Sequence, residues 1–211
     1  MKHQKRQAMP KNWPIPRKGT AFVVEGNSKS LPILLVLRDI LKIAKTRREV
    51  KQAIHVRALL LNNKPIVDEK LKMQLLDILT IIPEKKNYQL IFSENGKFSL
   101  EEVKNSKQKC SKVIGKKILK NKNIQLNLYD GRNYLSNLNC KVNDSATINL
   151  ESNKIERILP LKEKSKVLII GGKHTGKRGE IIELILDKKM VRIKTKESEF
   201  NVLIKQLMVI E

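Results

Sequence analysis

The hydrophobic pattern of the chain is helical in one region, between residues 30 and 55. Ser30 and Pro32 form a suitable helix start, an N-cap followed by a proline in the first turn. The apolar residues that follow at helical spacing are Ile33, Leu34, Leu37, Ile40, Leu41 and Ala44. A second helix can start at Thr46, because Thr46 and Glu49, three residues later, form a capping box. The pattern predicts two helices that pack against each other across a short turn.

The remaining hydrophobic positions mostly alternate, which is typical of half-buried strands. Asn95-Gly96 lies between two such segments, and Asp130-Gly131 follows one. Both are turn signals that predict hairpins. The expected strands are 58–61, 64–67, 77–81, 88–92, 98–100, 124–128, 146–150 and 167–170. The pattern therefore predicts an α+β fold that is mostly β.

Charge changes this picture more than any other bulk property. The chain has 44 Lys and Arg residues against 21 Asp and Glu, a net charge of +23 over 211 residues. Such a charge disfavours a compact isolated chain, so a polyanionic partner is expected, and nucleic acid comes first. The longest apolar run, Ile33–Leu37, is far short of the roughly 20 residues of a spanning helix, so we expect a cytoplasmic protein without a membrane partner. Aromatic residues make up only 4%, which favours binding through phosphates and shape over base stacking.

Residues with metal or redox chemistry are few and scattered. Cys110 and Cys140 are the only cysteines, which fits a reducing compartment, and neither has metal-ligand spacing. The three histidines, His3, His55 and His174, have no adjacent carboxylate or cysteine cluster. No metal, cofactor, small-molecule substrate or catalytic constellation is predicted.

The N-terminal segment is basic and rich in proline. Its cations are Lys2, Lys5, Arg6, Lys11, Arg17 and Lys18, with no acidic residue among the first twenty. Without hydrophobic periodicity the segment is expected to be disordered alone and to order against RNA, with Trp13 as a wedge or stacking group. The alternative is a solubilising tail.

A second group of cations surrounds the corner between the two predicted helices. Arg38, Lys42 and Lys45 follow one another at helical spacing, and the second helix begins with Arg47, Arg48 and Lys51. A solvated helix face normally alternates acids with bases, and few acids are near. Contact with RNA phosphates is therefore favoured over a solvated face. Eight further lysines between 104 and 122 predict a basic edge in the middle of the chain.

A glycine-rich loop near the C-terminus invites two interpretations. Gly171 followed by Gly176-Lys177 approximates a phosphate-binding P-loop, but Arg178 stands where that motif needs a hydroxyl, and a strand-like segment follows. The spacing of Gly172, Gly176 and Gly179 instead resembles the KOW module, a small β-barrel element of ribosomal proteins and elongation factors. Lys173, His174, Lys177 and Arg178 would then line a loop within reach of phosphates. A plain glycine turn facing water is the alternative.

Two helices followed by a small curled sheet also resemble the S-four RNA-binding domain. The resemblance implies that Arg38, Lys42, Arg47, Arg48, Lys51 and Arg57 contact RNA. The segments 31–44 and 124–133 are similar to the archaeal and eukaryotic-type small-subunit ribosomal protein four family. Eukaryotic members usually continue beyond the KOW module, so the likeness is to the archaeal form.

The order of these segments matches that family over essentially the whole chain. It implies a basic arm at 1–28, an S-four domain at 29–87, a central β domain at 88–159 and a KOW module at 160–211. The expected function is a structural constituent of the small ribosomal subunit, not an enzyme, with small-subunit ribosomal RNA and neighbouring ribosomal proteins as partners. The alternatives are an accessory factor for RNA modification, which would need a larger catalytic domain, and a KOW-bearing transcription elongation factor.

Overall fold

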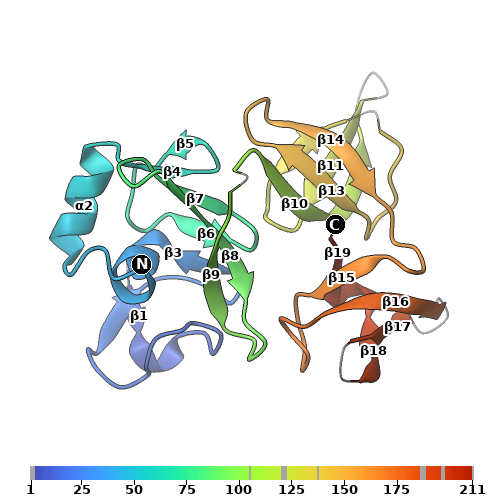
Figure 1. The fold of residues 1–211 in the computed structure, drawn as a ribbon, viewed down its shortest axis with the longest axis horizontal. Helices are drawn as coiled ribbons and strands as arrows, with labels where there is room; N and C mark the ends of the chain where they lie inside the picture. Colours follow the sequence, from blue (N-terminus) through green and yellow to red (C-terminus); the bar gives the residue numbers. More distant parts are fainter. Residues whose placement is uncertain are drawn as a thin grey trace. The chain divides into compact units, whose positions relative to one another are not determined.

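The computed structural model describes residues 3–104, 106–119, 123–136, 138–185, 189–195 and 198–210 (Figure 1). The chain divides into two compact units, residues 1–106 and 107–211. Most of the regular secondary structure of the described residues is strand, with a few short helices, which is the predicted α+β, mostly β class.

The first unit contains a five-stranded antiparallel sheet in the order β5-β4-β7-β8-β9 and two smaller strand pairs, β1-β2 and β3-β6. Its strands are β1 (His3–Lys5), β2 (Phe22–Val24), β3 (Ser30–Pro32), β4 (Leu59–Leu61), β5 (Lys64–Pro65), β6 (Lys72–Gln74), β7 (Ile78–Ile81), β8 (Lys86–Phe92) and β9 (Phe98–Glu102). Its helical elements are the 3₁₀ turn η1 (Arg6–Ala8), α1 (Ile33–Leu35), the π-helical η2 (Val36–Ile40) and α2 (Arg47–His55). Asn62 and Asn63, between the expected strands 58–61 and 64–67, both have positive φ and form the turn from β4 to β5.

The first helix is shorter than predicted. Ser30 and Pro32 belong to a strand paired with β6, so Ser30 is not an N-cap and the helix begins at Ile33. It ends at Ile40, because Lys42 takes a left-handed conformation (φ 55°) and the Ile43 N–H donates to the Leu37 carbonyl at 3.0 Å. This is a C-terminal capping arrangement. Lys42 and Lys45 consequently lie beyond the helix.

The second helix begins where the capping box predicts. The Thr46 hydroxyl accepts the Glu49 N–H at 3.3 Å, and the Glu49 carboxylate accepts the Lys45 N–H at 2.7 Å and the Thr46 hydroxyl at 2.9 Å. The bond from Lys45, then that from Thr46, holds the pKa of Glu49 below its usual value. Val50 and Ile54 are buried, as their spacing predicts.

The second unit holds two five-stranded sheets, in the orders β12-β11-β10-β13-β14 and β18-β17-β16-β15-β19. The first comprises β10 (Gln108–Ile118), β11 (Ile124–Leu128), β12 (Asn133–Leu135), β13 (Ser145–Asn149) and β14 (Lys154–Leu159). The second comprises β15 (Lys166–Ile169), β16 (Arg178–Ile185), β17 (Met190–Lys194), β18 (Glu199–Leu203) and β19 (Leu207–Val209), with the 3₁₀ turn η4 (Ile204–Gln206) before β19. Each sheet has its own buried cluster, around Val113 and Ile148 in one and around Ile169 and Ile193 in the other.

The boundary expected between residues 87 and 88 is not where the sheets divide. β8 and β9 pair with each other and with β7, so residues up to 102 complete the sheet of the first unit. The Asn95-Gly96 hairpin itself is confirmed, with Gly96 at φ 69°. Two successive hairpins, β7 with β8 and β8 with β9, therefore carry the first sheet past residue 88.

Candidate nucleic-acid interface

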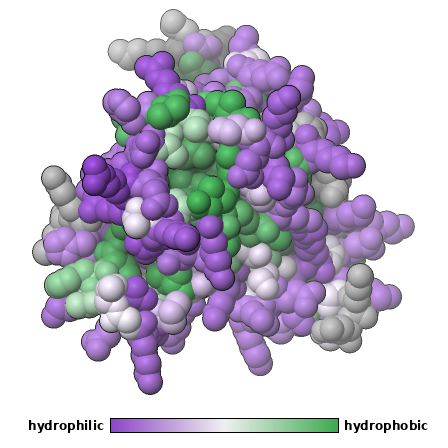
Figure 2. Space-filling model, turned by 60° about the vertical axis from the view of Figure 1, so that its left-hand side comes forward, coloured by the Kyte–Doolittle hydropathy of each residue, from purple (hydrophilic) through white to green (hydrophobic). Residues whose placement is uncertain are grey.

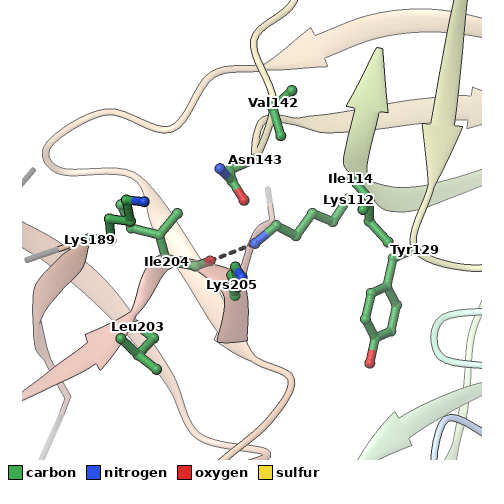
Figure 3. Close-up of a pocket in the computed structure, with 9 residues that line it drawn as sticks. All are labelled: Lys112, Ile114, Tyr129, Val142, Asn143, Lys189, Leu203, Ile204 and Lys205. Atoms are coloured by element: carbon green, nitrogen blue, oxygen red, sulfur yellow. Dashed lines mark hydrogen bonds between the residues drawn. The ribbon is translucent and has the colours of Figure 1, made fainter. Parts of the chain in front are cut away.

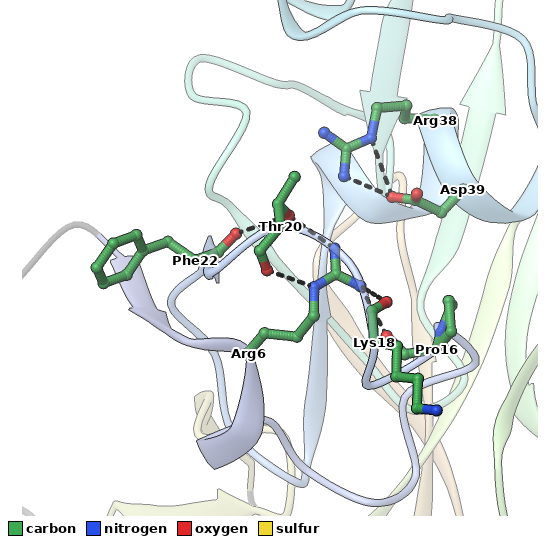
Figure 4. A network of polar contacts seen from close by, with 7 residues as sticks. All are labelled: Arg6, Pro16, Lys18, Thr20, Phe22, Arg38 and Asp39. Carbon is green, nitrogen blue, oxygen red and sulfur yellow. Dashed lines mark hydrogen bonds and ion pairs between the residues drawn. The ribbon is translucent and has the colours of Figure 1, made fainter.

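The N-terminal segment is folded from residue 3 onward, which corrects the prediction that residues 1–20 are disordered when the protein is free. Strands β1 and β2 pair across a 16-residue connection, and two arginines hold that connection in place. The Arg6 guanidinium donates to the carbonyl oxygens of Pro16 at 2.6 Å and Thr20 at 2.8 Å, and to the Thr20 hydroxyl (Figure 4). Arg17 donates to the carbonyls of Gln7 and Met9. Both guanidinium groups are therefore engaged in organising the backbone.

Trp13 cannot act as an RNA wedge in this structure, because only 1% of the residue is exposed. Its indole N–H donates to the Ser30 carbonyl at 3.1 Å. A Cβ on Gly26 would lie 2.4 Å from the Trp13 ring, so only glycine lets the chain pass so close. Lys5, Lys11 and Lys18 are exposed, whereas Lys2 lies outside the described residues.

Two arginines of the predicted cation corner are in ion pairs. Arg38 pairs with its neighbour Asp39 at 2.9 Å (Figure 4), and Arg47 pairs with Glu69, which is 22 residues away in the sequence. Burial acts to raise the pKa of the Glu69 carboxyl, but the bonds from Arg47 and from the backbone outweigh it and the pKa is lowered. Arg47 therefore neutralises a buried acid that is too distant in the sequence to be recognised as its partner from the local pattern.

The other cations of the corner are exposed. No ion pair or side-chain hydrogen bond with the described residues is made by Lys42, Lys45, Arg48 or Lys51, nor by Arg57, which the S-four resemblance added to them. They lie on α2 and on the turns at either end of it. Their ammonium and guanidinium groups are available to a polyanion.

The exposed cations share their surface with apolar side chains. Figure 2, turned so that the α2 side of Figure 1 comes forward, shows hydrophilic side chains over most of the face with apolar patches between them. Ile43 and Val56, each next to a cation in the sequence, are 46% and 69% exposed. The surface can therefore offer apolar contacts beside charge.

The glycine-rich loop joins β15 to β16, and a strand follows it as predicted. Gly172 and Gly176 have positive φ, 89° and 93°, which an L side chain rarely adopts. Lys173 and Arg178 are exposed, while His174 and Lys177 are half-buried. His174 stacks on Phe200 of β18 with ring centroids 3.9 Å apart. Phe200 is 26 residues away from His174, so the local sequence pattern could not indicate this partner.

The lysines predicted to form a basic edge along β10 are divided between surface and interior. Lys116 and Lys117 are exposed, but Lys109 and Lys112 are buried. The Lys109 ammonium pairs with the Asp130 carboxylate at 2.6 Å, and the two side chains are 1% and 3% exposed. Lys120 and Lys122 lie outside the described residues.

A search of the described residues finds no group of His, Cys, Asp and Glu that could hold a metal ion. Within the same residues, no helix is long and apolar enough to cross a membrane.

Comparison with known proteins gives consistent similarities. The model of the family "Ribosomal family S4e" matches residues 84–155. The small ribosomal subunit protein eS4 of Methanococcus maripaludis strain C6 is 34% identical over 216 aligned positions, which cover 94% of this chain and 88% of that protein. The eS4 protein of Archaeoglobus fulgidus is 33% identical over 85% of this chain and 78% of its own length. The crystal structure of the 30S ribosomal protein S4e from Thermoplasma acidophilum has a similar fold, with a TM-score of 0.73 at 22% identity over 86% of this chain and 95% of that one.

Proposed function

This chain belongs to the S4e family of ribosomal proteins, in its archaeal type, and we propose that it binds small-subunit ribosomal RNA through phosphate and shape contacts. It is a structural constituent of the small ribosomal subunit. The similarity to eS4 proteins over 94% of the chain carries this conclusion. The net charge of +23 fits an RNA partner of many phosphates.

Two surfaces support phosphate binding best. The first is the α2 corner, defined as Lys42, Lys45, Arg48, Lys51 and Arg57. The second is the β15–β16 loop, defined as residues 171–178, with Lys173 and Arg178 exposed. We assign the first surface to an S-four-type domain and the second to a KOW module, with neighbouring small-subunit proteins as further partners. Arg6, Arg17, Arg47 and Trp13 are assigned to the fold.

A different accessory role is less well supported. RNA-modifying enzymes and elongation factors also use these modules, but the relatives described above are named as small-subunit ribosomal proteins. Sedimentation of the tagged protein in a sucrose gradient tests the choice. Migration with the small subunit is expected, and migration with RNA polymerase would contradict the proposal.

The α2 corner is tested by the triple variant Lys45→Gln, Arg48→Gln, Lys51→Gln, which leaves the Arg47–Glu69 pair intact. Affinity for small-subunit RNA should fall about 100-fold, at about 1 kcal/mol for each exposed phosphate contact. The slope of log affinity against log salt should fall by roughly three. Filter binding at several salt concentrations measures both.

A matched control for the corner is Lys64→Gln, Lys72→Gln, Lys86→Gln, which removes the same charge from exposed strand positions. If both triple variants lose affinity equally, net charge accounts for the effect and the corner has no special role. Circular dichroism should be unchanged in both variants, since all six side chains are exposed.

The β15–β16 loop is tested with Lys173→Gln, Arg178→Gln. The salt slope should fall by roughly two, with a similar loss of affinity for different RNA sequences, because phosphate contacts do not read bases. The control is Lys154→Gln, Lys162→Gln, also exposed in the second unit. An unchanged slope in the loop variant would exclude the loop as a phosphate contact. A rise in melting temperature with ATP would instead favour a nucleotide site.

A further inference from the structure

A cavity of about 800 Å³ lies within the second unit, lined by residues of both of its sheets (Figure 3). Its apolar wall includes Ile114 of β10, Val142 before β13 and Leu203 of β18. These three side chains are 49%, 49% and 40% exposed, a large apolar exposure for one site. A ligand with an apolar or planar part would cover them.

The polar part of the cavity is cationic. Lys112, Lys189 and Lys205 line it together with Asn143, and none of the described lining residues is acidic. Lys189 and Lys205 are exposed at the rim. The three positive charges among the described lining residues favour an anionic ligand.

Lys112 is the unusual member of this group. The residue is 3% exposed, and its ammonium donates to the Ile204 carbonyl at 2.5 Å, as Figure 3 shows. An ammonium has three donors, and this bond uses one of them. Burial lowers the pKa of Lys112 to about 8. An anion that enters the cavity becomes an electrostatic partner for the protonated form of this buried amine.

We propose that this cavity binds one unpaired nucleotide of ribosomal RNA, with its phosphate held by Lys112, Lys189 and Lys205 and its base against Leu203 and Val142. The inference rests on the RNA-binding function proposed above. A nucleotide combines the anion that the lysines require with a planar group of the kind that the apolar wall can cover. Sequence-specific RNA recognition generally targets unstacked bases of loops, bulges and ends, which are away from paired helices.

The sign of the pH dependence follows from the same geometry. A bound phosphate stabilises the protonated amine, so the pKa of Lys112 must be higher in the complex than in the free protein. Binding therefore takes up protons near the free value of about 8. Affinity should be greatest below that pH and should decrease as the pH rises through it.

The test follows the Lys112 amine by NMR in the full chain labelled with ¹³Cε-lysine. The probes are a uridine hexanucleotide, uridine 5′-monophosphate, uridine and inorganic phosphate. The hexanucleotide is expected to raise the pKa of Lys112 and uridine to leave it unchanged. If inorganic phosphate alone gives the full shift, the cavity is a simple anion site. If the monophosphate binds as tightly as the hexanucleotide, its ligand is a free nucleotide. Either result, or no shift with any probe, overturns the proposal.

The rim is tested without disturbing the core. Lys189→Gln, Lys205→Gln should weaken hexanucleotide binding by about tenfold or more, the loss of one to two charge-assisted bonds. The control Lys154→Gln, Lys162→Gln should bind like the parent, and equal losses in both would count against the cavity. If the wild-type chain binds small-subunit RNA but the pKa of Lys112 does not change, the nucleotide pocket is refuted and the proposed function is not. Failure to bind that RNA at all refutes the proposed function.

Discussion

Replacing Trp13 by alanine is expected to lower the free energy of unfolding of the first unit by about 3–5 kcal/mol, the usual loss for a large buried aromatic side chain. The indole is almost fully buried and donates to the Ser30 carbonyl, so the variant loses packing and leaves that acceptor unpaired. Hydrogen exchange followed by mass spectrometry measures the loss in peptides from residues 3–104. Fluorescence is unsuitable, since Trp13 is the only tryptophan.

The control for Trp13 is Phe22→Ala on the neighbouring strand pair. Phe22 is 55% exposed, so its removal should change stability by no more than about 0.5 kcal/mol. Equal effects of the two substitutions would mean that residues 3–28 do not pack onto the unit in solution. In that case the first interpretation of the segment, an arm that orders only against RNA, would be restored.

Replacing Lys109 by methionine is expected to cost about 3–5 kcal/mol in the second unit, because Asp130 then keeps a buried, unpaired charge. The Lys109–Asp130 pair is 2.6 Å long and almost fully buried. Adding Asp130→Asn should recover much of the loss, since it removes the stranded charge while its side-chain oxygen can still accept the Arg132 N–H. Urea denaturation of the single and double variants measures the coupling.

A neighbouring ion pair provides the matched control for Lys109. Lys107 and Glu151 lie 3.4 Å apart, but their side chains are 68% and 57% exposed. Lys107→Gln should therefore change stability by less than about 1 kcal/mol. If Lys109→Met is as mild as this control, the buried pair does not contribute to stability as its geometry indicates.

Features set by neighbouring residues could be predicted from the sequence. The capping box of α2 depends on Thr46 and Glu49 alone, and the Asp130-Gly131 hairpin depends on two turn residues, with Gly131 at φ 79°. Strand β11 has the predicted bounds for the same reason, since strict alternation over 124–128 fixes which face is buried. In each case local preference and tertiary packing agree.

The roles of the arginines could not be predicted, because their partners are distant in the sequence. Arg6 binds carbonyls 10 and 14 residues away, and Arg47 binds a carboxylate 22 residues away. A cation that holds a loop and a cation that meets RNA have the same local pattern. The S-four resemblance implied an RNA contact for Arg47, whereas the structure shows an ion pair, and only the three-dimensional neighbours distinguish the two roles.

The position of β19 has a consequence for the order of folding during synthesis. All strands of the first unit lie before residue 103, so that unit can close while the rest of the chain is still being made. β15 has β16 on one side and β19 on the other, and the Val209 N–H also donates to the Ser145 hydroxyl at 3.0 Å. Until residue 209 has been added, Val167 and Ile169 lack their second neighbouring strand. The two units should therefore mature at different times, and the nascent second unit is the one that would need protection from aggregation.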